Sequence, residues 1–160
     1  MDFQKFANDM KNKAKEAFDK TVQFGAEQIA GSSFTLETLK EFEDFIGESK
    51  QTTFTKEDGT TKIYDHTVII IVGDEKSDFF KEALIQFPIL VTKAFSQNIK
   101  LKLAKSEMEN LDLSKYKAKN TPALLMFTNE KIAKVIEGEE NIEKITKSFT
   151  MDIVSEIEKY

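Results

Sequence analysis

The chain has 160 residues, 40% of them hydrophobic and 32% charged, which is typical of one globular domain with a core of its own. The net charge of −5, with lysine as the only basic residue besides one histidine, argues against a nucleic-acid partner, because such binding depends on a basic surface. The chain contains no cysteine, which excludes disulfides, thiolate nucleophiles and thiol redox couples.

The N-terminal region, residues 1–31, is interpreted as an amphipathic helix that precedes a domain over residues 32–160. Apolar residues recur there at spacings of three or four, namely Phe3, Ala7, Met10, Ala14, Phe18, Val22, Gly25 and Ile29. The mean spacing is slightly above 3.6, so the apolar stripe of residues 3–29 stays nearly straight.

This helix has three open roles: packing on the domain, formation of a homo-oligomer, and contact with a membrane surface. Over residues 1–30 five lysines balance five acids, so no net charge draws the helix to anionic lipid, and we favour the first two roles over membrane contact. The N-terminus lacks the apolar core of a signal peptide, and no segment has the roughly 18 apolar residues of a membrane span. We expect a cytoplasmic protein.

The next segment predicts a helix that is opened by Ser33 or Thr35 and ends near Gly47. A hairpin is expected between residues 52 and 65, because Asp58-Gly59 favours a two-residue turn. Such a turn places Phe54 opposite Ile63.

From residue 66 onward, strand and helix patterns alternate. Residues 66–72 are a continuous apolar run, typical of a strand buried on both faces, and Ser77 can cap a helix over residues 78–96 that contains Pro88. The remaining expected elements are a strand over 99–105, a short helical turn over 113–116, strands over 122–128 and 131–136 joined at Asn129-Glu130, and one C-terminal helix over 141–160. Long strand–helix–strand connections imply parallel pairing, so we expect a mixed sheet with helices on both faces.

The segment SKYKAKNTPALLMFTNEKIAKVIEG, residues 114–138, resembles the thioredoxin family without a gap. The matching positions are Lys115, Tyr116, Pro122, Leu124, Leu125, Phe127, Asn129 and Gly138. FPIL at 87–90 is similar to the Pro-Ile-Leu of the family's active-site helix, and the resemblance is strongest over residues 66–160. It implies a thioredoxin-like α/β fold in which Pro122 is a cis-proline at the start of a strand; the alternative is a trans-proline that merely begins the strand.

In redox-active members of that family, the backbone beside the cis-proline accepts an extended substrate strand. Carried over to this chain, the resemblance implies a polypeptide-binding groove framed by Phe79, Phe80, Ala83, Thr121, Pro122 and Gly138. The alternative is that both phenylalanines belong to the core. One of two adjacent phenylalanines on an amphipathic helix is expected to point away from the core, so both interpretations stay open.

The sequence departs from the family in three ways. Counting back from Pro88, the two family cysteines fall on Phe80 and Ala83, neither of which can form a thiolate. The family's glycine in the last hairpin is Glu130, a residue with a Cβ where a positive φ is needed. The family's leading strand comes before its first helix, whereas here a hairpin follows the helix, so we expect a different sheet edge.

Other candidate sites are weaker. His66 stands alone, and we expect it to make one hydrogen bond at a strand edge instead of binding zinc. Asp74, Glu75 and Asp78 suit the start of a helix, and no nucleotide or EF-hand motif is present. We expect no cofactor and no metal.

The leading hypothesis is a non-catalytic thioredoxin-like protein that binds a polypeptide or partner protein. The alternatives are an enzyme with non-thiol chemistry on the same fold and a structural or membrane-surface module formed by the N-terminal helix.

Overall fold

The computed structural model describes residues 34–160, and the helix expected over residues 3–29 lies outside them. The helices in chain order are α3 (Leu39–Gly47), α4 (Asp78–Ser96), the 3-10 turn η1 (Leu113–Tyr116), α5 (Glu139–Lys147) and α6 (Ile153–Glu158). The strands are β1 (Thr35–Leu36), β2 (Thr52–Thr55), β3 (Thr61–Tyr64), β4 (Thr67–Gly73), β5 (Ile99–Lys105), β6 (Ala123–Thr128) and β7 (Lys131–Glu137). In this part of the chain, no helix combines the length and apolarity needed to cross a membrane.

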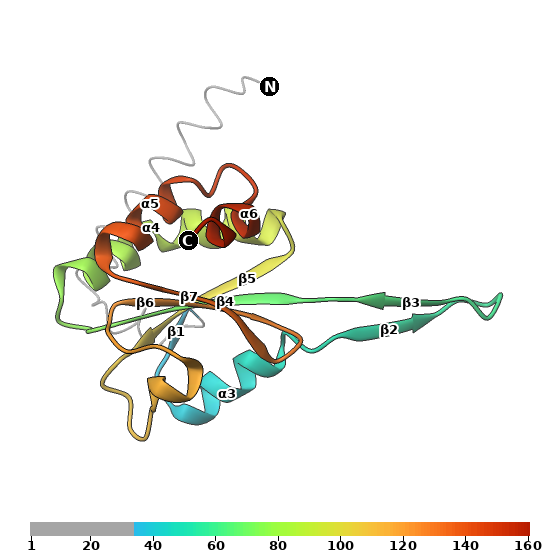
Figure 1. Cartoon of the computed structure of the whole chain (residues 1–160), viewed down its shortest axis with the longest axis horizontal. Helices are drawn as coiled ribbons and strands as arrows, with labels where there is room; N and C mark the ends of the chain where they lie inside the picture. The colour runs from blue at the N-terminus through green and yellow to red at the C-terminus, as the bar shows by residue number, and fades with distance from the viewer. Residues whose placement is uncertain (1–33) are drawn as a thin grey trace, which may run out of the picture.

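The main sheet has five strands in the order β1-β5-β4-β6-β7 (Figure 1). The central strand β4 pairs in parallel with β5 and antiparallel with β6, and β6 pairs antiparallel with β7. The chain passes from β4 to the parallel strand β5 through α4, as predicted from the long connection between the strand patterns of residues 66–72 and 99–105. The expected mixed sheet is therefore confirmed.

Helices cover both faces of this sheet (Figure 1). Alternate residues of β4 face opposite sides: Ile69 and Ile71 join the core under α4, α5 and α6, while Val68, Ile70 and Val72 join the core with α3 and η1. The sequence of β4 therefore does not alternate between apolar and polar residues, because neither face of the strand is exposed to solvent.

The strand β1 corrects two expectations about the start of the domain. Thr35 does not cap a helix: it lies in β1 and pairs with Leu103 of β5. The cap of α3 is Thr38, whose side chain accepts a hydrogen bond from the N–H of Glu41 at 3.2 Å. A leading strand before the first helix is thus present at the edge of the main sheet, although it has only two residues, and the hairpin that follows the helix does not form this edge.

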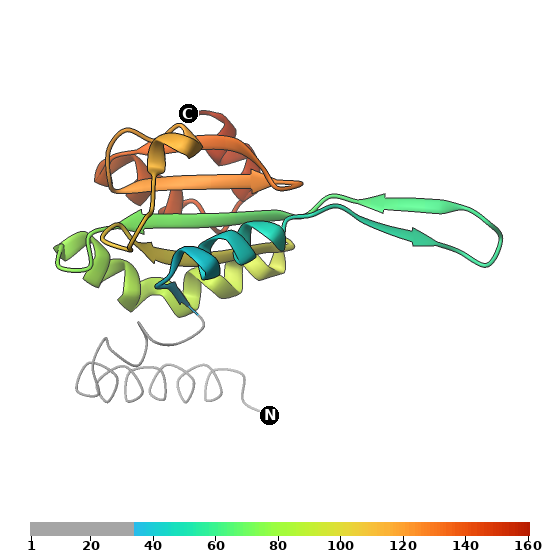
Figure 2. The same cartoon turned by 90° about the horizontal axis from the view of Figure 1, so that it is seen from below.

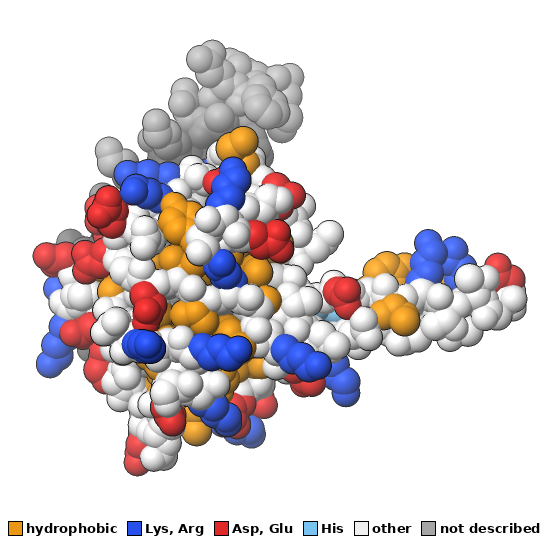
Figure 3. Space-filling view, viewed as in Figure 1, with side chains coloured by type: hydrophobic (Ala, Val, Ile, Leu, Met, Phe, Trp, Pro, Cys, Tyr) orange, Lys and Arg blue, Asp and Glu red, His pale blue; other side chains and the backbone are white. Residues whose placement is uncertain are grey.

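The hairpin of β2 and β3 forms an arm that projects from the body of the protein (Figure 2). Its turn has three residues instead of two, because Lys56 pairs with Thr60 through a hydrogen bond of 2.8 Å and Gly59 takes a φ of +85°. The extra residue shifts the register by one, so that Phe54 faces Lys62 and not Ile63. Both strands are exposed throughout, and hydrophobic side chains lie on the surface of the arm (Figure 3).

The C-terminal segment is two helices and not one. Asp152 caps α6 by accepting the N–H of Ser155, and this cap competes with continuation of the preceding helix. The side chain of Gln97 holds the break, because its oxygen accepts the N–H of Ile153 at 2.8 Å. This contact spans 56 residues, so local periodicity did not reveal it.

The hairpin between β6 and β7 turns at Asn129 and Glu130, as predicted. Both residues have positive φ angles, 51° and 65°, which fits a tight turn between twisted strands. Ser49, fully buried after α3, accepts the N–H of Glu130 on its hydroxyl at 2.8 Å and the N–H of Asn129 on its carbonyl at 2.9 Å. The turn is thereby fixed to the end of α3.

Candidate functional site

Pro122 lies at the point where β6 begins, beside the end of β4. Val72 pairs with Ala123, so the register brings Gly73 next to Pro122. The N–H of Gly138 donates to the carbonyl of Pro122 at 3.0 Å, which adds the start of α5 to the same edge of the sheet. The bond between Thr121 and Pro122 is cis, as the resemblance implied.

A single carboxylate holds the loop that leads to Pro122. One oxygen of Glu137, at the end of β7, accepts the N–H of Asn120 at 2.6 Å and that of Lys119 at 2.5 Å. These two hydrogen bonds, the first the larger cause, lower the pKa of Glu137 below its ordinary value, because they favour the charged form.

Between this anchored loop and β6, Thr121 is exposed. Within residues 34–160, neither its N–H nor its carbonyl takes part in a hydrogen bond. The anchored neighbours on both sides hold this backbone in place, so an extended chain can pair with it at little entropic cost.

The structure buries both adjacent phenylalanines at the start of α4, which corrects the expectation that one would point outward. Phe80 has no exposed surface and Phe79 only 8%, and both belong to the core under α4. They pack against Gly73: a Cβ added there would meet Phe80 at 3.3 Å and Phe79 at 3.7 Å. The position matched to the family's first cysteine is therefore inside the protein.

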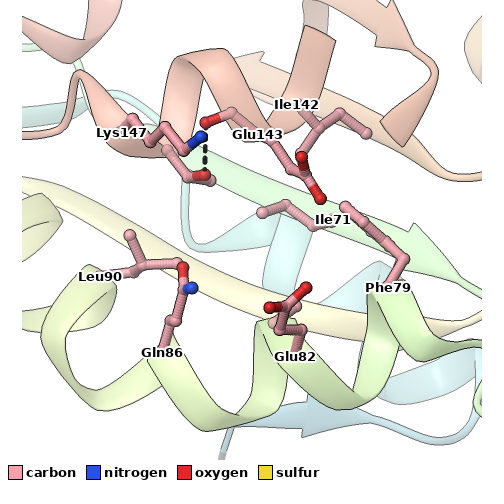
Figure 4. Close-up of a pocket in the computed structure, with 10 residues that line it drawn as sticks. Ile71, Phe79, Glu82, Gln86, Leu90, Ile142, Glu143 and Lys147 are labelled. Carbon is pink, nitrogen blue, oxygen red and sulfur yellow. Dashed lines mark hydrogen bonds between the residues drawn. The ribbon is translucent and has the colours of Figure 1, made fainter. Parts of the chain in front are cut away.

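Phe79 and Ala83 nevertheless line a groove of about 180 Å³ between α4 and α5. Its floor includes Ile71, and its walls carry Glu82 and Gln86 from α4 opposite Glu143 and Lys147 from α5 (Figure 4). The hydroxyl of Thr146 donates to the carbonyl of Glu143 at 3.0 Å on the α5 side. Sequence reasoning did not select the α5 residues, because their outward charges look like an ordinary solvated helix face.

The other sequence candidates have structural roles. The Nε2 atom of His66 lies 2.8 Å from the hydroxyl of Thr52, which is the single hydrogen bond expected of it. Asp74 and Ser77 form the turn before α4, and Ser77 accepts the N–H of Phe80 at 3.1 Å. Among residues 34–160, no three histidine or acidic side chains are grouped so as to hold a metal ion.

Solved structures place this architecture among known folds. The chain is similar to oxidised thioredoxin from Plasmodium falciparum, with 10% identity, a TM-score of 0.52, and coverage of 75% of this chain and 100% of that one. It is similar to thioredoxin from Fasciola hepatica, with 10% identity, a TM-score of 0.50 and coverage of 72% and 98%, and to a designed protein with 10% identity, a TM-score of 0.51 and coverage of 73% and 93%. No protein-family model matches the chain, and no curated protein sequence matches it either. At such identities the likeness shows the fold, which is thioredoxin-like, and not the activity.

Proposed function

From a thioredoxin-like fold built without cysteine, we propose that this chain is a non-catalytic protein that binds an extended polypeptide of a partner beside Pro122. The observation that supports it best is the backbone of the exposed residue Thr121, which makes no hydrogen bond within residues 34–160. An added strand needs this kind of main-chain donor and acceptor. Disulfide exchange is not part of the proposal, because the chain has no thiol.

The groove between α4 and α5 is proposed as the pocket for one side chain of the bound polypeptide. Its volume of about 180 Å³ is below the roughly 300–1,000 Å³ of sites for drug-sized ligands, which favours a single side chain over a cofactor. Phe79 and Ala83 supply apolar wall, while Glu82 and Lys147 supply polar rim. Phe79 also packs against Gly73, which the register of β4 and β6 places next to Pro122, and this proximity is the reason for assigning the groove and the backbone of Thr121 to one bound polypeptide.

A permanently unfolded polypeptide, reduced and alkylated, is the probe for this proposal. Binding is measured by fluorescence anisotropy, and the contact surface by amide chemical shifts, which we expect to change at Thr121, Gly138 and the groove residues. Ala83→Phe fills the groove and should weaken binding at least tenfold. Ala133→Phe is the matched control, because Ala133 is exposed on β7, away from the groove.

Two results would contradict the proposal. The first is the absence of any binding by the unaltered chain at protein concentrations of hundreds of micromolar. The second is an affinity that Ala83→Phe and Ala133→Phe reduce equally, since a groove contact predicts loss only in the first variant.

A further inference from the structure

The outward face of α4 exposes large apolar side chains among its polar ones. Ile85, Ile89 and Phe95 keep 47%, 61% and 72% of their surface exposed, and Pro88 lies beside the two isoleucines. The inward face of α4 is also apolar and fully packed. The helix α5, in contrast, turns glutamates and lysines outward. Large apolar side chains that gather on the exposed face of a helix mark a surface that another segment covers.

A second groove extends this apolar surface toward the sheet edge. Its volume is about 230 Å³, and its apolar lining includes Phe34, Phe45, Val91, Phe95 and Ile99. The ammonium group of Lys102 lies 5.0 Å from the ring centre of Phe45 and so forms part of the rim. The outer face of α4 and this groove are together called the α4 outer surface.

The described part of the chain begins at this surface. The ring of Phe34 packs edge-on against Phe87 of α4, with 5.5 Å between ring centres, and its carbonyl accepts the N–H of Leu103 at 2.8 Å. The four residues 30–33 span at most about 14 Å. Residue 29 is five such steps from Phe34 and is therefore held within about 18 Å of it in any conformation.

We infer that the apolar stripe of residues 3–29 covers the α4 outer surface of the same chain. The sequence predicts a straight stripe on a helix of about 40 Å, which is longer than the roughly 28 Å of the 19-residue α4. The apolar stripe and the exposed apolar residues of α4 can pack against each other at helix–helix distance. The short connection raises the effective concentration of the segment to the millimolar range, which favours this chain over a second copy. The inference goes beyond polypeptide binding at Thr121 and involves a different face of α4.

The absence of cysteine makes the inference testable in the full chain, since an introduced thiol is the only one present. Ile89→Cys places that thiol in the α4 outer surface, and Ile63→Cys places one on the arm; the two isoleucines are equally exposed, at 61% each. If residues 3–29 cover α4 for about 90% of the time, the thiol at position 89 reacts with a maleimide about tenfold more slowly than that at position 63.

A second substitution in each cysteine variant distinguishes protection of the thiol by residues 3–29 from a low intrinsic reactivity of that thiol. Ala14→Asp puts a charge into the apolar stripe, whereas Asn12→Asp puts the same charge on the opposite side of the predicted helix. We expect Ala14→Asp to raise the reactivity at position 89 about tenfold and Asn12→Asp to leave it unchanged. Protection should also be independent of protein concentration.

Two outcomes overturn the inference. Equal reactivity at positions 89 and 63, unaffected by Ala14→Asp, means that the stripe does not cover α4. Protection that disappears on hundredfold dilution, together with a dimer in sedimentation, assigns the surface to a second copy of the chain instead. Both cysteine substitutions replace exposed side chains, so the circular dichroism spectrum should stay that of the unaltered chain.

Discussion

Replacing Ser49 by alanine should destabilise the domain far more than a surface serine does. Ser49 has no exposed surface, and its hydroxyl donates to the carbonyl of Ile46 at 2.6 Å while it accepts the N–H of Glu130 at 2.8 Å. Ser49→Ala removes both hydrogen bonds. The carbonyl of Ile46 keeps the N–H of residue 49 as a donor, at 3.0 Å, whereas the N–H of Glu130 loses its partner.

The magnitude follows from these two contacts. A hydrogen bond contributes about 0.5–1.5 kcal/mol, and a buried group left unpaired costs about 1–3 kcal/mol, so we expect a loss of about 2–3 kcal/mol. For a domain of this size that lowers the midpoint of thermal unfolding by roughly 6–15 °C.

Urea unfolding followed by circular dichroism measures this loss. The control is Ser155→Ala, because Ser155 is exposed within α6 and its hydroxyl makes no hydrogen bond in the described part of the chain; we expect a change within about 0.5 kcal/mol. A loss for Ser49→Ala as small as the control would refute the reasoning, since it would mean that the turn after β6 does not depend on the end of α3.

Three further predictions test other contacts. The pKa of Glu137 is lowered in the folded state, so its contribution to stability is present above its ordinary pKa and is lost as the pH falls through the lower folded value. Glu137→Gln should therefore reduce the loss of stability between pH 7 and pH 3. A pH profile of stability that this variant leaves unchanged would contradict the contact. Phe80→Ala should cost about 3–5 kcal/mol, whereas Phe95→Ala, at a side chain 72% exposed, should cost much less. Glu130→Gly should stabilise by up to about 1 kcal/mol, because glycine takes the positive φ of 65° without strain but loses more entropy on folding; destabilisation would contradict this explanation.

The elements that the sequence predicted correctly have strong local signals. The continuous apolar run of β4 and the Ser77 cap of α4 are complete within a few residues, so no distant contact was needed to recognise them. The hairpin at Asn129 was predicted both from the resemblance and from the two strand patterns that flank it. The resemblance also grouped Thr121, Pro122 and Gly138. In the structure these residues lie at one edge of the sheet.

The predictions that were wrong missed either contacts between residues distant in sequence or a one-residue shift in strand register. The two-residue strand β1 exists because β5 offers it an edge about 70 residues away, as the pair Thr35 and Leu103 shows. The arm has a shifted register because one additional residue in its turn moves every partner by one. Phe80 was expected near the surface because the family's reactive position was transferred by counting, and counting does not report which side of the helix faces the sheet.

The two proposed surfaces lie on different sides of α4, and this makes their tests independent. At about 100° per residue, Phe79 and Ala83 point on average roughly 120° away from Ile85 and Ile89, so a segment on the outer surface leaves the apolar part of the groove beside α5 open. Ala83→Phe should therefore weaken binding of the unfolded probe at least tenfold without changing the reactivity of a thiol at position 89. Ala14→Asp should do the reverse. A variant pair in which both measurements change together would show that the segment and the bound polypeptide compete for one surface, contrary to the geometry of this helix.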